Sequence, residues 1–284
     1  MKIIHISDTH LEEGENLQRW QRLMHLIQSQ SALQLEQTIL LHTGDLLETG
    51  NQANRQLALK SLNEIKPLFK QILLAPGNHD YGGFWGLSSD AHINFINEFH
   101  EFIFADNADY FPTLQLIDDQ YALIGLDSNQ GELCFLEKLF AEGDLGTQQL
   151  IRLNQLLDSK ALKNRTKVIY LHHHPFAFRF RSRPGMSLLQ QLQLALLINP
   201  TRRFRRMKNA RQFLQTIQNR ADVLLFGHKH EGLDCQQYAH PFGIKLAFDA
   251  GSSTDTTDIS QKISYRVIDL DTLEVTSFEH PVKE

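Results

Sequence analysis

The sequence predicts an α/β protein in which parallel strands alternate with helices. Apolar runs of strand length alternate with amphipathic stretches of helical period over residues 2–75. Strands and helices that alternate at this length connect parallel neighbours through right-handed crossovers. Because ligands of such sheets bind beyond the carboxyl ends of the strands, we expect the chemistry at that edge. A chain of 284 residues is also long enough to bury a large core.

The expected elements follow this pattern in chain order. The first ones are a strand at 2–7, a helix at 16–30, a strand at 37–42, a helix at 51–65 and a strand at 71–75. Asp118 and Asp119 predict the turn of a hairpin between 113–117 and 121–126. A helix is expected over 146–162, with Thr147 as a suitable N-cap. Further strands are expected at 167–171, 223–226, 243–250, 263–270 and 274–278.

The composition argues against several classes of protein. Two cysteines, Cys134 and Cys235, provide no disulfide framework, which favours a reducing compartment. The first strand begins at Lys2 and leaves no room for a signal peptide, and the longest apolar stretch, 186–198, is too short to span a bilayer. We therefore expect a cytoplasmic protein, with peripheral membrane association as a second option. The net charge of −5 predicts no stable complex with nucleic acid.

One segment departs from this acidic balance. Residues 176–211 contain nine basic residues and no acidic one, and Arg179 and Arg181 alternate there with phenylalanines. We predict that this segment forms a helical basic cap inserted within the domain. Two interpretations remain open. The cap either has an ordinary solvated basic face, or it recruits a polyanion, such as a substrate with several phosphates, a nucleic-acid strand or an anionic membrane surface.

Five short polar segments stand at the ends of expected strands. They are Asp8-Thr9-His10, Gly44-Asp45, Gly77-Asn78-His79-Asp80, His172-His173-His174-Pro175 and Gly227-His228-Lys229-His230. Oxygen and imidazole ligands without thiolate suit Mn, Fe, Zn or Co better than a structural zinc site. With one histidine of the triple, the segments offer seven ligands, which is too many for one tetrahedral ion. Two ions that share a bridging group fit the set better.

Local geometry gives a reason for the spacing of these ligands. In an extended segment residues i and i+2 point to the same side, so Asp8 and His10 are expected to face one cavity, as are His228 and His230. Three glycines, namely Gly44, Gly77 and Gly227, are expected to let the backbone turn sharply after a strand. The histidines outside the segments are interpreted as ordinary surface or core residues: His5, His25, His42, His92, His100, His240 and His280.

In this order the segments resemble the blocks of the calcineurin-like metallophosphoesterases, over residues 4 to about 252. The resemblance is closest to the bacterial cyclic-nucleotide phosphodiesterase branch, in the segments at 7–11, 43–46, 76–80 and 171–175. It implies a single domain over 1–284, folded as a four-layer α/β/β/α sandwich of the metallo-dependent phosphatase type around a binuclear metal centre. The basic cap is where the chain departs most from that branch.

The resemblance also implies roles for individual residues. The first ion would be held by Asp8, His10 and His230 and the second by Asn78, His172 and His228, with Asp45 bridging both. His173 is the alternative to His172, which directly follows the apolar strand. His79 would act on the phosphoryl oxygens or the leaving group, and Asp80 would orient it by a hydrogen bond. Substrate contacts are expected from Asn78, His79, Arg179 and Arg181.

The implied function is metal-dependent phosphoester hydrolysis. The first candidate is a phosphodiesterase that hydrolyses a cyclic or other small nucleotide diester with a hydroxide held between the two ions. Within the same chemistry, the alternatives are a pyrophosphohydrolase or phosphodiesterase acting on a membrane-presented lipid, and a nuclease. A non-catalytic binding scaffold with the same fold is the alternative of another class, but the complete ligand set and His79 argue against it. The expected ions are Mn and Fe, with Zn as an alternative.

Overall fold

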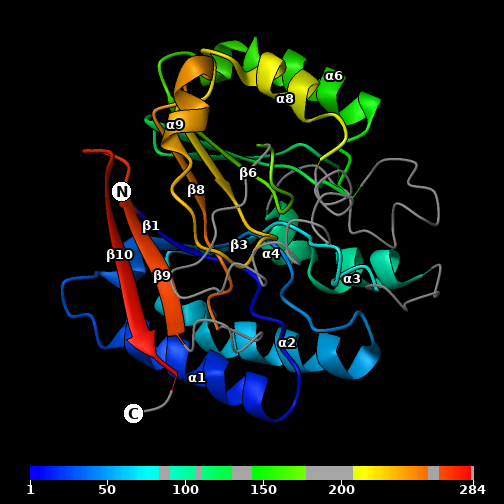
Figure 1. Ribbon diagram of the computed structural model, residues 1–284, viewed down its shortest axis with the longest axis vertical. Coiled ribbons are helices and arrows are strands. Elements are labelled where there is room, and N and C mark those ends of the chain that lie inside the picture. Colours follow the sequence, from blue (N-terminus) through cyan, green and yellow to red (C-terminus); the bar gives the residue numbers. More distant parts are fainter. Residues whose placement is uncertain (83–89, 106–109, 130–142, 177–206, 255–261, 283–284) are drawn as a thin grey trace, which may run out of the picture.

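Two five-stranded sheets pack face to face, and helices cover both outer faces (Figure 1). The computed structural model describes residues 1–82, 90–105, 110–129, 143–176, 207–254 and 262–282. The four layers confirm the α/β/β/α fold expected from the sequence. The expected basic cap at 176–211 lies almost entirely outside the described residues, which include only its first residue and 207–211.

The first sheet has the strand order β10-β9-β1-β2-β3. Its strands are β1 (Lys2–Ile6), β2 (Thr38–His42), β3 (Gln71–Leu74), β9 (Lys262–Asp269) and β10 (Glu274–Pro281). The strands β1, β2 and β3 are parallel, with Ile4 opposite Leu40 and Leu40 opposite Ile72. β9 runs antiparallel to β1, and β10 runs antiparallel to β9. Every residue of β2 is buried, because helices cover one face of the sheet and the second sheet covers the other.

The second sheet has the strand order β4-β5-β6-β7-β8. Its strands are β4 (Thr113–Ile117), β5 (Tyr121–Gly125), β6 (Thr166–Tyr170), β7 (Val223–Phe226) and β8 (Leu246–Asp249). β4 and β5 form the predicted antiparallel hairpin, and Asp118 in its turn has a φ of 48°. The strands from β5 to β8 are parallel.

The helices divide between the two sheets. Those packed on the first sheet are α1 (Glu15–Gln28), α2 (Gln52–Ile65), α3 (Ala91–Glu98) and α4 (His100–Phe104), and those on the second are α6 (Thr147–Leu157), α8 (Ala210–Ile217) and α9 (Gln236–Ala239). The described residues also form short 3₁₀ helices, namely η1 (Leu35–Gln37), η2 (Lys66–Leu68), η3 (Lys160–Leu162) and η4 (His240–Phe242). None of the described helices is long and apolar enough to cross a bilayer.

The core has three parts, one for each interface between layers. Trp20 and Leu23 of α1 pack with Ile4 of β1 beneath the first sheet. Leu153 of α6 and Phe213 of α8 belong to the equivalent cluster above the second sheet. Between the sheets lies a cluster that includes Ile39, Leu73, Leu123, Val168 and Val223. Because side chains alternate along each strand, successive residues of a strand serve different clusters.

The structure confirms most of the expected strands and corrects some details. The expected helix at 146–162 ends at Leu157 and is followed by η3. Its N-cap is Gly146, while Thr147 is the first helical residue, so the predicted Thr147 cap is wrong. The strand expected at 243–250 is confined to β8, because Gly243 ends η4 with a φ of 72°. The helices α3, α4, α8 and α9 were not predicted.

The carboxyl ends of strands from both sheets meet at one edge of the sandwich. Beyond β1 and β2, Asp8 N donates a hydrogen bond to Gly44 O at 3.0 Å. Beyond β6 and β7, Gly227 N donates to His172 O at 3.0 Å. The backbone N of His228 in turn donates to the Asp8 carboxylate at 3.0 Å, which joins the two sheets. The polar segments predicted to contain the chemistry therefore lie together.

Candidate metal centre

Two groups of potential metal ligands share one aspartate. One group contains Asp8, His10, Asp45 and His230, and the other contains Asp45, His172 and His228. Within each group the ligand atoms lie within 4.8 Å of one another. The first sheet supplies the aspartates and His10, and the second sheet supplies the remaining histidines. The site therefore exists only where the two sheets meet.

The first group is centred on Asp8 and His230. Asp8 Oδ1 lies 3.1 Å from His230 Nε2, and His230 Nε2 lies 3.3 Å from His10 Nε2. Asp8, His10 and Asp45 are buried, with 3% or less of each residue exposed, whereas His230 is half-buried. The group is thus enclosed on the protein side and open on the side of His230.

The second group is centred on His172. Its Nε2 lies 3.2 Å from both Asp45 Oδ2 and Asn78 Oδ1, and 3.3 Å from His228 Nδ1. The His172 Nδ1–H donates to Thr43 O at 2.8 Å. Because a carbonyl oxygen can only accept, this bond keeps a proton on Nδ1 and turns Nε2 toward the group. The amide oxygen of Asn78 therefore lies beside the second group.

The donor set fits a metal ion better than it fits an empty polar pocket. Ligand atoms at about 2.0–2.1 Å from an ion lie about 3.0–3.4 Å from one another, which matches the separations above. The facing nitrogens of His172 and His228 gain little from each other without a cation between them. Oxygen and imidazole donors without thiolate are typical of Mn, Fe or Zn sites.

The backbone brings the ligands together in a way that the sequence analysis did not predict. Asp8, His10, His228 and His230 have φ values of 51°, 46°, 81° and 56°. These residues lie beyond the strands in the left-handed region, so the expected alternation of an extended segment is wrong. Each conformation is costly for a residue other than glycine and must be held by its surroundings.

The glycines also differ from the expectation. Gly44 has a φ of 94° and makes the sharp turn that was predicted. Gly77 and Gly227 are required by close approach instead. A Cβ at Gly77 would lie 2.2 Å from Asp45 Oδ1, and one at Gly227 would lie 2.0 Å from Ser7 Oγ.

The histidine triple divides into three environments. His172 faces Asp45, in line with the sequence expectation. His173 forms a hydrogen bond with Ser128 Oγ through its Nδ1 at 2.8 Å. His174 accepts a hydrogen bond at Nδ1 from the backbone N of Phe176, and its Nε2 lies 3.9 Å from Asp249 Oδ2. Among the three, only His172 belongs to a ligand group in the described residues.

His79 is oriented by a different residue from the one expected. The two carboxylate oxygens of Asp80 accept hydrogen bonds from Leu47 N at 2.9 Å and Gly77 N at 2.8 Å, so the expected bond to His79 is wrong. The His79 Nδ1–H instead donates to the backbone O of Glu48 at 2.8 Å. Asp80 acts one step further away, by closing the turn that contains Asn78 and His79.

Glu48 is a site residue that the sequence analysis missed. Its Oε2 lies 3.1 Å from His10 Nδ1, and it forms a third group of possible ligands with His10 and His79. The only signal in the sequence is its position three residues after Asp45. Glu48 thus contacts two histidines of the site, one through its side chain and one through its backbone.

Burial and neighbouring charges shift the pKa values of the site. Burial opposes ionisation of the Asp45 carboxyl, but His172 and His79 outweigh it and hold its pKa well below the usual range. Burial likewise opposes protonation of His172, yet the Asp45 carboxylate raises its pKa to about 10. Burial, followed by the charges of His173 and His172, lowers the pKa of His228 well below its usual value. The site therefore places ionised carboxylates beside imidazole nitrogens, and a proton or a metal cation between them would balance the negative charge.

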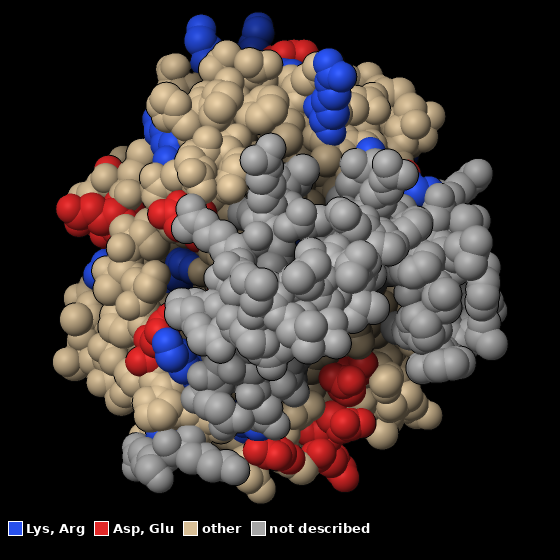
Figure 2. All heavy atoms as spheres, in the orientation of Figure 1, with Lys and Arg blue, Asp and Glu red and all other residues tan. Residues whose placement is uncertain are grey.

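The remaining predicted site residues, Arg179 and Arg181, lie outside the described residues. On the face shown in Figure 2, the lysines and arginines of the described part are scattered singly rather than gathered in a patch. The polyanion-binding interpretation of 176–211 therefore stays a prediction. Of the two cysteines, Cys235 is free and buried, and Cys134 also lies outside the described residues.

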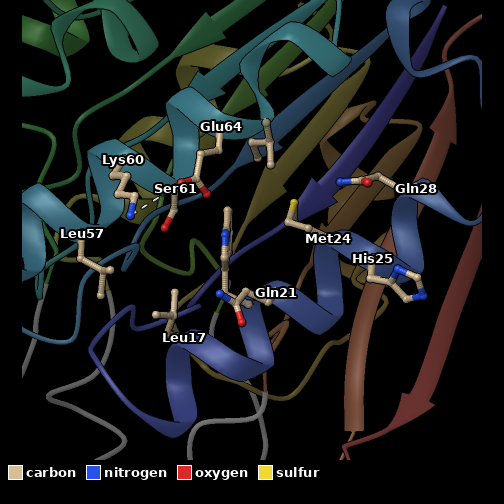
Figure 3. Close-up of a pocket in the computed structure, with 11 residues that line it drawn as sticks. Leu17, Gln21, Met24, His25, Gln28, Leu57, Lys60, Ser61 and Glu64 are labelled. Carbon is tan, nitrogen blue, oxygen red and sulfur yellow. Dashed lines mark ion pairs between the residues drawn. The ribbon is translucent and has the colours of Figure 1, made fainter.

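A separate cavity of about 290 Å³ lies between α1 and α2 in the outer helical layer (Figure 3). Leu17, Trp20 and Met24 line it from α1, and Lys60 and Glu64 from α2. None of its lining residues belongs to a ligand group. The catalytic candidates therefore lie at the strand ends and not in this cavity.

The fold and the ligand groups agree with the comparison to known proteins. The chain belongs to the calcineurin-like phosphoesterase family, whose sequence profile matches residues 1–232. A dimetal phosphatase from Danio rerio superposes with a TM-score of 0.63 at 12% identity, over 100% of this chain and 97% of that chain. An archaeal phosphodiesterase gives a TM-score of 0.41 at 12% identity, over 99% of this chain and 100% of that chain. No curated protein sequence matches the chain.

Proposed function

We propose that the protein is a binuclear metal-dependent phosphodiesterase that acts on a cyclic or other small nucleotide diester. The observation that supports this proposal most is the position of Asp45, which belongs to both ligand groups. A carboxylate shared in this way can bridge two ions. Family membership supports phosphoester hydrolysis, and two-metal sites are suited to in-line displacement at phosphorus.

The geometry supports one assignment of the ligands. Asp8, His10 and His230 would hold the first ion, Asn78, His172 and His228 would hold the second, and Asp45 would be shared by both. The Glu48 carboxylate contacts Nδ1 of His10, the ring nitrogen on the side away from the proposed ion, as carboxylates commonly do for metal-bound histidines. The bound ions would supply an activated water and would neutralise charge on the phosphoryl oxygens.

His79 is proposed as the group that moves a proton. Its Nδ1–H is engaged by Glu48 O, so its Nε2 remains for the leaving-group oxygen. Burial lowers the pKa of His79, but Asp45 and the Glu48 carbonyl outweigh this and raise it above the usual value. A protonated Nε2 can therefore donate to the departing oxygen as a general acid.

Preference for a diester rests on the residues around the ligands. The segments at 7–11, 43–46, 76–80 and 171–175 resemble those of the cyclic-nucleotide phosphodiesterase branch. Mn and Fe are the proposed ions because the donor set combines oxygens with imidazoles, and Zn is the alternative. These assignments are tested together by one set of assays.

The experiment uses metal-stripped protein reloaded with Mn, Fe, Zn or Mg. We would measure hydrolysis of bis-p-nitrophenyl phosphate and p-nitrophenyl phosphate by the parent protein, Asn78→Ala and His79→Ala. We expect metal-dependent turnover that is faster for the diester and falls at least about 100-fold in both variants. His25→Ala, on the outer face of α1, is the control and should retain parent activity.

The other possible outcomes of these assays would support a different function. Faster turnover of the monoester would make the protein a phosphatase and would overturn the diester assignment. A panel of cyclic nucleotides, lipid pyrophosphates and oligonucleotides then distinguishes the nucleotide proposal from the lipid and nuclease alternatives. If no metal restores activity toward either ester, the catalytic proposal fails and the binding scaffold replaces it.

A further inference from the structure

A short segment that begins at the last residue of β8 connects the second sheet to the first. This segment, Asp249–Thr254, is called the strap here. β8 is the edge strand of the second sheet, whereas β9, which follows the strap in the chain, lies beside β1 in the first sheet (Figure 1). The strap is buried, with Asp249, Ser253 and Thr254 fully inaccessible and Ser252 only 6% exposed. It lies outside residues 1–232, the part that matches the family profile.

The strap binds the backbone of the loop that contains Asp8 and His10. Three consecutive strap residues donate to three consecutive carbonyl oxygens: Ser252 Oγ to Asp8 O at 2.8 Å, Ser253 N to Ser7 O at 2.9 Å and Thr254 Oγ1 to Thr9 O at 3.1 Å. In return, Ser7 N donates to Ser253 Oγ at 3.1 Å. The two hydroxyl donors, from Ser252 and Thr254, thus hold the two peptide carbonyls that lie between the Cα atoms of Asp8 and His10.

This loop needs such support because its conformation is strained. Asp8 and His10 both have positive φ values, which L-residues adopt only when the surrounding structure determines them. If the loop relaxed, the Asp8 carboxylate and the His10 ring would leave the first ligand group. The hydrogen bonds from the strap act directly on the peptide groups whose rotation would allow this.

The strap also contacts the loop that contains His228 and His230. A Cβ at Gly251 would lie 2.6 Å from Gly232 N, so the two backbones touch. Arg266 of β9 stabilises this contact between the strap and the His230 loop. Its guanidinium donates one hydrogen bond to Asp249 O in the strap and another, of 2.6 Å, to Gly232 O. The Arg266 side chain is buried between the sheets, with 9% of the residue exposed.

We propose that the strap positions the first metal subsite, with the hydroxyls of Ser252 and Thr254 as positioning residues and Arg266 as the link to the His230 loop. This inference rests on the proposed function, since it takes Asp8, His10 and His230 as ligands. The strap touches the loops of all three of these residues. Asn78 and His172, which belong to the second subsite, contact each other, and His172 also contacts Asp45 and Thr43. Loss of the strap hydroxyls should therefore weaken one of the two ions.

The experiment measures Mn²⁺ binding to the metal-stripped full chain by isothermal titration calorimetry. The double variant Ser252→Ala/Thr254→Val removes both hydroxyl donors with little change in volume. Thr254→Ser keeps the hydroxyl and serves as the conservative rescue. Thr216→Val is the matched control, because Thr216 Oγ1 also donates to a backbone carbonyl, that of Gln212 in α8, at 2.9 Å.

We expect the parent to bind two Mn²⁺ ions and the double variant to bind one of them about 10-fold or more weakly. Thr254→Ser and Thr216→Val should bind both ions like the parent. If circular dichroism shows that the double variant is unfolded, the single variant Ser252→Ala decides by the same titration. Equal affinity of both ions in folded variants and parent would overturn the positioning role alone. A parent that binds no Mn²⁺ would overturn the proposed function itself.

Discussion

At the scale of single residues, two imidazoles of the site are oriented by backbone carbonyl oxygens. Thr43 O accepts from His172 Nδ1, and Glu48 O accepts from His79 Nδ1. These bonds choose the tautomer and so decide which nitrogen faces the site. The chemistry of a histidine here depends on a neighbour that its own sequence position does not reveal.

Glu48→Gln tests one of these neighbours. Gln keeps the size of the side chain but removes the negative charge beside His10 Nδ1, so we expect metal affinity to fall about 10-fold. The backbone bond from Glu48 to His79 should remain, and the loss of activity at saturating metal should therefore be small. Mn²⁺ titrations followed by kinetic assays separate the two effects.

The control for Glu48→Gln is Glu64→Gln. Glu64 is an exposed residue of α2 whose carboxylate lies 3.9 Å from Lys60 Nζ. It undergoes the same chemical change far from the strand ends. Parent-like metal affinity in Glu48→Gln would show that its carboxylate does not hold His10.

At the scale of elements, the site depends on loops after neighbouring strands that approach each other so closely that only glycine fits at the point of contact. Gly77 and Gly227 each leave room for an aspartate of the neighbouring loop. Such contacts place ligands from β1 and β2 against ligands from β3 and β7. The loops after β3 and β7 therefore bring their ligands to the site only because residues 77 and 227 are glycines.

Gly227→Ala should damage the metal site more than the fold. The added Cβ would lie 2.5 Å from Asp8 Oδ2 and must push this carboxylate aside. A displacement of about 1 Å costs about 100-fold in activity in a preorganised site. Diester hydrolysis and Mn²⁺ affinity measure the loss.

Gly125→Ala is the control for Gly227→Ala, because it makes the same change inside a sheet and away from the ligands. Its Cβ would meet Thr113 Oγ1 at 2.5 Å inside the second sheet, so the variant should lose stability. Its metal affinity at a temperature where it is folded should equal that of the parent. If Gly227→Ala also retained parent affinity, the close approach of Gly227 to Asp8 would have no role in the site.

At the scale of the whole molecule, the two sheets are joined by ligands from both. Asp8 and Asp45 follow strands of the first sheet, and His172 and His228 follow strands of the second. An ion bound between them therefore stabilises the contact between sheets. Metal should raise the stability of the folded chain, with a gain that grows with the logarithm of its affinity.

Metal loading should raise the melting temperature of the metal-stripped protein. At 100 times the dissociation constant, one ion adds about 2.7 kcal/mol to the free energy of unfolding. Differential scanning calorimetry with and without Mn²⁺ measures the shift. Asp45→Asn should reduce it strongly, because this residue belongs to both ligand groups. An unchanged shift in Asp45→Asn would contradict the bridging assignment.

The pH dependence of stability reflects buried histidines beneath the site. His42 accepts a hydrogen bond at Nδ1 from Gly44 N, and its Nε2–H donates to Thr9 Oγ1 at 2.9 Å. Burial lowers its pKa to about 3, whereas in the unfolded chain it titrates near 6.5. Burial, helped by Arg266, likewise lowers the pKa of His5 well below 6.5.

Stability of the metal-stripped protein should therefore fall as pH is lowered. Between about pH 6.5 and pH 3 the unfolded chain binds a proton that folded His42 does not, which costs about 1.4 kcal/mol per pH unit. His42→Gln should reduce this slope by about one proton. Urea unfolding at several values between pH 7 and pH 5 measures it, and an equal slope in the variant and the parent would contradict the assignment.

Much of the molecule follows from local patterns in the sequence. The alternation of apolar runs determines the strands of both sheets, because burial on both faces requires continuous apolar residues. The order of polar segments after those strands determines the donor types and the family. The helices α3 and α4 were missed because they are short and their packing depends on contacts with the rest of the first layer.

The sequence by itself determined the α/β class, the calcineurin-like family and seven candidate ligands at strand ends. Only the tertiary structure decided that His172 faces Asp45 while His173 faces Ser128, and that Glu48 rather than Asp80 contacts His79. It also revealed the strap, which meets Asp8 across 244 positions of sequence. Ligand chemistry is a local property of residue type, whereas the direction of a side chain depends on partners that are distant in the chain.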